Sequence, residues 1–237
     1  MSNEANISID DARALVADET LWPRMRNFLW DFTPQIHASW LEGLRIPDGT
    51  AHSQRIKTYV LSSLGVAPVF HSFPKGDWSR LLLLDGATLE STAKWLGALA
   101  CAESLRRVTS GEVVRGLKSA LRGVYPEVFG YTAYFERDLS DLRDVKDGEA
   151  GVDFKRRDAK AQSAQSGKLS ESVVKTGYAV LLSALTSLPS SLVSRLKFKL
   201  SKNLCDSASL RLKQETCGRV LAKLLKLKFP EAYKLCC

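Results

Sequence analysis

Apolar residues recur at helical spacing through several long stretches of this chain, and this pattern restricts the possible fold more than any other feature. Helices are predicted over 87–107, 109–124, 127–139, 173–188 and 206–228, with a further one opened by Pro189. Shorter helices are predicted over 10–19, 23–32 and 56–64, around Trp40-Leu41 and around Val69-Phe70. The pattern predicts an all-α fold, with room for one short strand at most, in a single compact multi-helix domain.

Small residues interrupt the apolar face of the helix expected over 87–107. Gly97, Ala98, Ala100 and Ala102 lie among its leucines. A glycine inside a helix costs about 1 kcal/mol relative to alanine, so we expect another element to pack closely against this helix. Thr109 and Glu112 have the spacing of a capping box, which predicts the start of the next helix.

The most plausible internal boundary is the charged stretch 140–168, which contains few large apolar residues. This composition favours a flexible linker or a solvated extension of a helix. It divides the chain into an N-terminal part of helices and irregular segments (1–76), a central helical core (77–139), the charged segment (140–168) and basic C-terminal helices (169–237) that pack on the core.

The net charge of +8 is unevenly distributed. Residues 1–50 contain four Lys or Arg and eight Asp or Glu, and residues 51–154 contain thirteen of each. Residues 155–237 contain seventeen basic and five acidic residues. This asymmetry favours an acidic partner, nucleic acid or a membrane surface without choosing among them.

Neither the beginning of the chain nor its apolar runs predict export or membrane insertion. The first residues are acidic and lack a basic segment followed by an apolar block, and no apolar run approaches the roughly 18 residues of a membrane span. The five cysteines form no CxxC pair, so we expect reduced thiols in a cytoplasm. The terminal Cys236-Cys237 pair is compatible with a frayed reduced end or, in a eukaryotic chain, with prenylation.

No arrangement of residues in this sequence predicts a reaction. His37, His52 and His71 have no acidic or cysteine neighbour at ligand spacing, and the chain has neither a GxSxG elbow nor a phosphate-binding glycine loop. We therefore expect no enzyme activity, no catalytic residue, no cofactor and no metal.

Three blocks of sequence resemble the SctK/YscK family of type III secretion sorting-platform accessory proteins. The first is Trp78 to Phe129, with the block Leu96-Gly97-Ala98-Leu99 and the step Leu105-Arg106-Arg107-Val108. The second is Leu181 to Leu200, where a leucine-rich helix and a Leu-Pro turn precede an Arg-x-Lys-x-Lys-Leu ending. The third, Ile36 to Leu41, is similar to the family's His-x-Ser-Trp-Leu-like segment. The blocks cover about a third of the chain and occur in the family's order.

The resemblance implies a non-catalytic adaptor of a bacterial injectisome, in the cytoplasm at the inner membrane. Its partners would be the cytoplasmic domain of the inner-membrane ring protein and the pod, or C-ring, protein, and it would have no small-molecule substrate. It would be peripheral to the membrane through these partners. Candidate partner contacts are Trp40, Arg106, Arg107, Arg195, Lys197, Lys199 and Lys202.

The alternative is a basic helical protein that binds nucleic acid or a membrane surface. The lysine density of the C-terminal third fits this alternative. The scarcity of aromatic residues that could stack on bases, and the lack of a known DNA- or RNA-binding signature, argue against nucleic acid.

Overall fold

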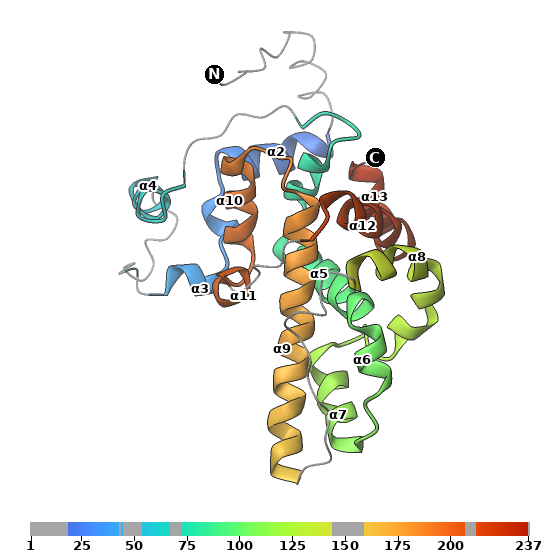
Figure 1. Ribbon diagram of the computed structural model, residues 1–237. Coiled ribbons are helices and arrows are strands. Elements are labelled where there is room, and N and C mark those ends of the chain that lie inside the picture. Colours follow the sequence, from blue (N-terminus) through green and yellow to red (C-terminus); the bar gives the residue numbers. More distant parts are fainter. Residues whose placement is uncertain are drawn as a thin grey trace. The chain divides into compact units, whose positions relative to one another are not determined.

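The computed structural model describes residues 19–42, 44, 54–66, 73–143, 159–206 and 212–236 (Figure 1). Throughout these ranges every regular element is a helix and no strand occurs, so the predicted all-α class is confirmed. None of the helices in the same ranges has both the length and the apolar character needed to cross a bilayer. The predicted helix 10–19, the segment Val69-Phe70 and Cys237 lie outside the described residues.

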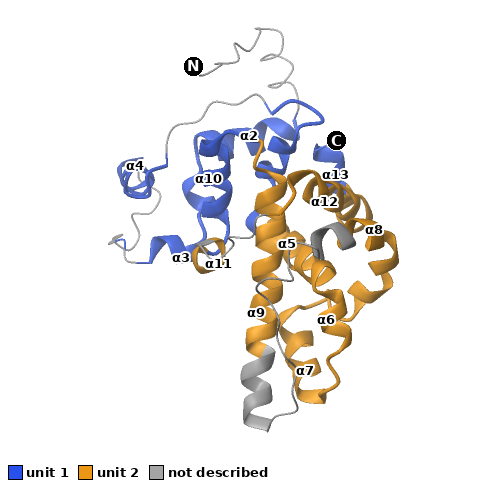
Figure 2. Ribbon diagram, viewed as in Figure 1, with its two compact units in different colours: residues 1–86, 188–201, 231–237 blue, residues 87–187, 202–230 orange. Residues whose placement is uncertain are grey.

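Packing divides the chain into two compact units that alternate along the sequence (Figure 2). Unit 1 comprises residues 1–86, 188–201 and 231–237, and unit 2 comprises residues 87–187 and 202–230. Each unit is therefore assembled from segments that are distant in sequence. The boundaries predicted after residues 76, 139 and 168 divide the chain into consecutive segments. They stay a prediction.

Unit 1 has a core of aromatic and leucine side chains. Phe28 packs edge to face against both Phe32 and Phe73, at centroid distances of 5.6 Å in each case. The predicted buried run Leu81 to Leu84 is indeed buried, and the Asp77 carboxylate opens this turn by accepting a hydrogen bond from the Ser79 amide. The elements of this unit are α2 (Leu21–Leu29), η1 (Thr33–Gln35), α3 (Ala38–Leu41), α4 (Gln54–Ser63), η2 (Trp78–Leu83), α10 (Ser190–Lys199) and most of α13 (Pro230–Cys236).

Unit 2 is built around the long helix α9 (Ala159–Ala184), which contacts α7, α11 and α12. Helix α7 lies alongside α9 in Figure 1, and α12 also contacts α8. The remaining elements complete the unit: α5 (Gly86–Ala100), α6 (Ala102–Arg106), α7 (Gly111–Ala120), η3 (Glu127–Gly130), α8 (Thr132–Arg143), α11 (Lys202–Asp206) and α12 (Gln214–Lys228).

Helices α5 and α9 touch backbone to backbone where each carries a glycine. A Cβ atom on Gly97 would lie 1.9 Å from the carbonyl oxygen of Val173, and one on Gly177 would lie 1.7 Å from that of Ala93. No side chain fits at these distances, so only glycine permits the contact. The close approach expected from the small residues near Gly97 is confirmed, and α9 is the element that makes it.

Several predicted helix ends are wrong. In these places the backbone leaves the helical conformation although the apolar residues continue at helical spacing. The helix expected over 87–107 is interrupted at Cys101, with ψ 10°, and continues as α6. The helix expected over 109–124 ends at Ala120, because Leu121 takes ψ 42°. The predicted capping box is not formed, since Ser110 rather than Thr109 is the N-cap and its side chain makes no capping hydrogen bond.

The C-terminal predictions also need correction. The helix expected over 206–228 begins only at Gln214, because Lys213 is extended, with ψ 115°. In the charged segment 140–168, residues 140–143 and 159–168 are helical, which matches the alternative of a helix extension at both ends. Residues 144–158 lie outside the described part of the chain. The helix that follows Pro189 is confirmed as α10.

Candidate functional site

The candidate functional residues are the partner contacts predicted from the sequence. Among the described residues, no group of three or more His, Cys, Asp and Glu side chains is placed to hold a metal ion. His37 has a local structural role, because its Nδ1 atom accepts a hydrogen bond from the Ser39 amide at 3.2 Å and caps α3. His52 and His71 are not among the described residues.

Trp40, the aromatic member of the predicted contact set, is half-buried inside unit 1. Its indole Nε1 donates a hydrogen bond to the carbonyl oxygen of Leu200 at 2.8 Å, and its ring packs edge to face on Phe198 at 4.7 Å. The His37 amide donates to the carbonyl oxygen of Phe198 at 2.7 Å. Trp40 thus ties α3 to the end of α10, which is an internal role.

Arg195 and Lys199 occupy consecutive turns of α10 and both face the interior of unit 1, each only 3% exposed. Arg195 Nη1 donates to the carbonyl oxygen of Phe28 at 2.5 Å. Lys199 Nζ donates to the carbonyl oxygens of Leu82 at 2.6 Å and Leu84 at 2.8 Å. Backbone acceptors take the place of water around both cations, so neither presents its charge to a partner.

Aromatic rings also face these two cations. The guanidinium of Arg195 lies 5.2 Å from the ring centroid of Phe32, and Lys199 Nζ lies 5.0 Å from that of Phe28. Burial nevertheless lowers the pKa of Lys199 to about 7, although the nearby carboxylate of Asp85 acts in the opposite direction. Burial lowers the pKa of Arg195 as well. The buried lysine therefore changes its charge near neutral pH.

The other predicted basic contacts are exposed. Lys197 is exposed on α10, and Lys202 is exposed at the start of α11. Arg107 pairs with Glu103 at 2.6 Å. Arg106 donates to the Thr132 hydroxyl at 2.5 Å and covers the ring of Phe129 at 5.6 Å. The predicted set is thus divided between the two units.

Further basic residues of the C-terminal third are neutralised by carboxylates of unit 2. The carboxylate of Asp138 on α8 is almost buried. It accepts a hydrogen bond from Arg219 Nε at 3.1 Å and also pairs with Lys223. Burial raises the pKa of Asp138, but the hydrogen bonds and charges of these two cations outweigh it and lower the pKa overall. Lys228 pairs with Glu127 and lies over the rings of Trp95 and Tyr131, at 4.5 and 4.2 Å from their centroids.

Sequence reasoning missed the exposed side of α2. Trp22 and Arg26 on α2 and Trp30 at its C-cap follow one another at intervals of four residues, and we call these three residues the α2 stripe. Trp22 is half-buried, whereas Arg26 and Trp30 are exposed. The two indoles meet edge to face with centroids 5.8 Å apart, and Trp30 is 57% exposed. Helical spacing places these three residues on one side of α2, but it does not predict that a tryptophan there is exposed.

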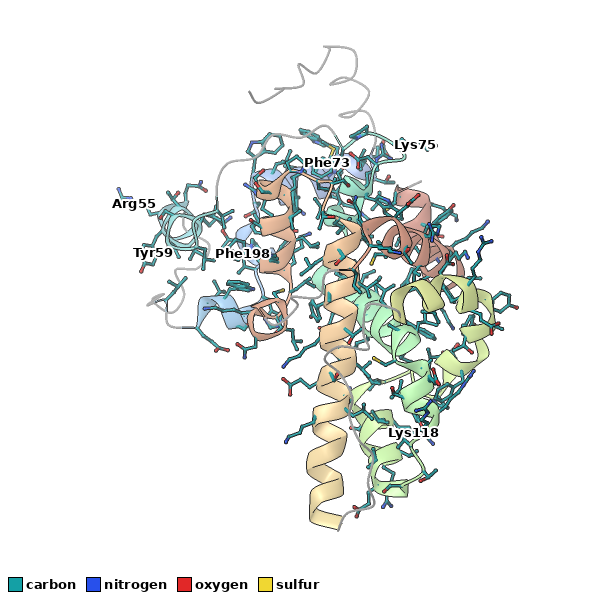
Figure 3. The ribbon with its side chains drawn as sticks, viewed as in Figure 1. Arg55, Tyr59, Phe73, Lys75, Lys118 and Phe198 are labelled. Atoms are coloured by element: carbon teal, nitrogen blue, oxygen red, sulfur yellow. The ribbon has the colours of Figure 1, made fainter. Side chains whose placement is uncertain are left out.

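The opposite face of α2 is anchored in the core. Leu21, Met25, Phe28 and Leu29 are buried, and Arg195 binds the carbonyl oxygens of Phe28 and Leu29. The stripe therefore lies on a helix whose position is set by packing. Tyr59 and Arg55 project from the exposed side of another helix, α4 (Figure 3).

Comparison with known proteins assigns no family: no family model, curated protein or solved structure matches this chain.

Proposed function

We propose that this chain is a non-catalytic adaptor of a bacterial type III secretion injectisome. In this role it links the cytoplasmic domain of the inner-membrane ring protein to the pod protein of the sorting platform. It acts in the cytoplasm and reaches the inner membrane through these partners. The proposal rests on the resemblance to the SctK/YscK family.

The observation behind the proposal concerns the residues that resemble the family, because several of them occupy packing positions in this structure. Gly97, from the block Leu96-Gly97-Ala98-Leu99, makes the backbone contact between α5 and α9. Arg195 and Lys199, from the Arg-x-Lys-x-Lys-Leu ending, fill the interior of unit 1. Chance similarity between leucine-rich helices does not require special residues at packing positions. These residues thus have structural roles in this chain, and the proposed function itself rests on the resemblance.

The alternative of a nucleic-acid-binding or membrane-surface protein loses much of its electrostatic basis. This alternative depends on the excess of basic residues in 155–237. Arg195 and Lys199 are buried. Carboxylates from outside this segment, Asp138 and Glu127, pair with Arg219, Lys223 and Lys228. A non-specific nucleic-acid contact needs cations that reach phosphates.

Co-purification from the native bacterium tests the proposal. The chain carries an affinity tag at its own locus, membranes are solubilised after mild crosslinking, and bound proteins are identified by mass spectrometry. We expect the ring and pod proteins to be recovered, and we expect membrane association of the chain to disappear in a strain that lacks the ring protein. Recovery of neither protein, together with salt-sensitive retention on DNA, would contradict the proposal.

A further inference from the structure

We propose that the α2 stripe docks an acidic segment of a protein partner, which covers the two indoles with apolar side chains. Successive members of the stripe are about 40° apart around the helix axis, so Trp22, Arg26 and Trp30 form one narrow band. This inference deepens the proposed adaptor function and rests on it, because it names the chemistry of one partner.

The apolar content of the stripe points to a contact that excludes water. A tryptophan buries about 150–250 Å² when it is covered, and Trp30 leaves more than half of its surface in solvent. Tryptophan and arginine are the residue types that most often dominate binding energy at protein interfaces. A typical specific interface buries about 800 Å² on each partner, and two tryptophans that flank an arginine fit the centre of such an interface.

The anchoring of α2 favours binding because little freedom is lost. Four residues of the helix are buried on the opposite face, and Arg195 holds the carbonyl oxygens of Phe28 and Leu29. The two indoles also restrict each other through their edge-to-face contact. When the side chains of a surface are already ordered, binding loses less conformational entropy and the affinity is higher.

Charge complementarity selects an acidic partner. Helix α2 contains no acidic residue, and within the described part of the chain Arg26 forms no ion pair. The carboxylate of Asp31, just beyond the helix, is bound by Lys57 at 2.7 Å. The charge of Arg26 is therefore available between the two tryptophans, where a carboxylate could bind it while apolar side chains cover the rings.

The same geometry disfavours the other anionic partners. Bases bind to exposed aromatic faces by stacking, but each indole here already contacts the other, edge to face. An anionic membrane attracts clusters of basic residues, whereas this stripe has a single arginine and the adjacent Asp31-Lys57 pair would lose its water. An acidic protein segment is the occupant that satisfies both the rings and Arg26.

Binding of two matched peptides to the purified full chain tests this inference. One labelled peptide forms an amphipathic helix with Leu and Phe on one face and Glu on the other; the second has Lys in place of every Glu. We expect fluorescence anisotropy to report binding of the acidic peptide alone. Trp30→Ala should weaken that binding at least tenfold, and Arg26→Gln should weaken it several-fold and reduce its dependence on salt.

Two variants provide matched controls. Arg24→Gln removes the same charge from the same helix, but Arg24 lies about 160° around the axis from Arg26. Tyr59→Ala removes a 46% exposed aromatic ring from α4. Both should change the affinity less than twofold. Circular dichroism and urea unfolding of each variant establish that it is folded.

Several outcomes would overturn the inference. These are no binding of the acidic peptide, equal binding of both peptides, or an equal loss of binding in Tyr59→Ala and Trp30→Ala. Trp30-dependent binding of phosphatidylglycerol vesicles or duplex DNA, without peptide binding, would assign the stripe to a membrane or to nucleic acid. The adaptor function is tested separately: if ring and pod proteins co-purify with Trp30→Ala as they do with the parent chain, the adaptor role stands and the docking surface fails.

Discussion

Arg195 and Lys199 bring two positive charges into the interior of unit 1. Burial of an isolated cation is costly, because the protein interior replaces its hydration shell poorly. Here backbone carbonyl oxygens accept hydrogen bonds from both side chains, and the rings of Phe28 and Phe32 face them. The carbonyl groups of Leu82 and Leu84 in turn obtain a donor. Arg195 and Lys199 thus connect α10 to α2 and η2. These hydrogen bonds partly offset the free-energy cost of removing the two cations from water.

The lowered pKa of Lys199 makes the stability of the protein depend on pH. Burial lowers this pKa to about 7 from the usual lysine value of 10.5. Between these values the unfolded chain binds more protons than the folded chain, so the free energy of unfolding rises with pH. Relative to Lys199→Met, which has no titrating group at this position, the parent chain should gain about 2 kcal/mol between pH 7 and pH 9.

Urea unfolding at half-unit steps from pH 6 to pH 9 measures this gain. Lys197→Met, which removes an exposed lysine from the same helix, should follow the parent chain at every pH. Parallel stability curves for the parent chain and Lys199→Met would show that Lys199 keeps an ordinary pKa in the folded state.

At the scale of elements, the crossing of α5 and α9 is a contact that the addition of a single Cβ atom would disrupt. Gly97 and Gly177 lie at the same crossing, and a Cβ on either would enter the backbone of the other helix. Backbone atoms cannot move aside as the end of a flexible side chain can. The sequence predicted that some element approaches Gly97, but many segments are apolar enough to be that element, so only the folded chain identifies α9.

Replacement of Gly97 by alanine should force the two helices apart. Overpacking in a core costs about 1–3 kcal/mol and occasionally more. Because the added Cβ would lie 1.9 Å from a carbonyl oxygen, we expect Gly97→Ala to lower the free energy of unfolding by at least about 2 kcal/mol. Chemical denaturation followed by circular dichroism measures the change.

Gly218→Ala is the matched control for this prediction. Gly218 lies inside α12, and a Cβ added there meets no atom within 4 Å. This variant should stabilise the protein by up to about 1 kcal/mol, because alanine favours helix formation. If both variants had the same effect, the close contact between α5 and α9 would not govern stability.

At the scale of the whole molecule, the interleaving of the two units means that the N-terminal segment lacks part of its own core. Unit 1 needs α10, which follows unit 2's helix α9 in the chain. Leu192 and Leu196 of α10 and Leu200 at its C-cap are buried. The Trp40 indole binds the Leu200 carbonyl oxygen, and the Phe28 carbonyl oxygen of α2 binds Arg195 of α10. The predicted division after residue 76 would separate these contacts.

A fragment of residues 1–86 should therefore not fold by itself. It lacks the apolar side chains of α10 and both buried cations, so it leaves much of the core of unit 1 exposed to water. We expect little helical circular dichroism, narrow dispersion of amide NMR signals and no cooperative urea transition. The full chain measured under identical conditions is the control, and a cooperative transition in the fragment alone would contradict this view.

The sequence by itself determined the all-α class, the buried run at Leu81 to Leu84, the helix after Pro189 and the close approach at Gly97, because each depends on local spacing or on the properties of one residue type. The direction of each charged side chain was decided by tertiary structure. In the series Arg195, Lys197 and Lys199 only Lys197 is exposed, and Trp30 is exposed although its neighbours Leu29 and Phe32 are buried. Burial of a lysine or exposure of a tryptophan depends on carbonyl groups and rings supplied by distant segments. A local pattern contains no information about those partners, and for that reason the α2 stripe and the buried cations emerged only from the folded chain.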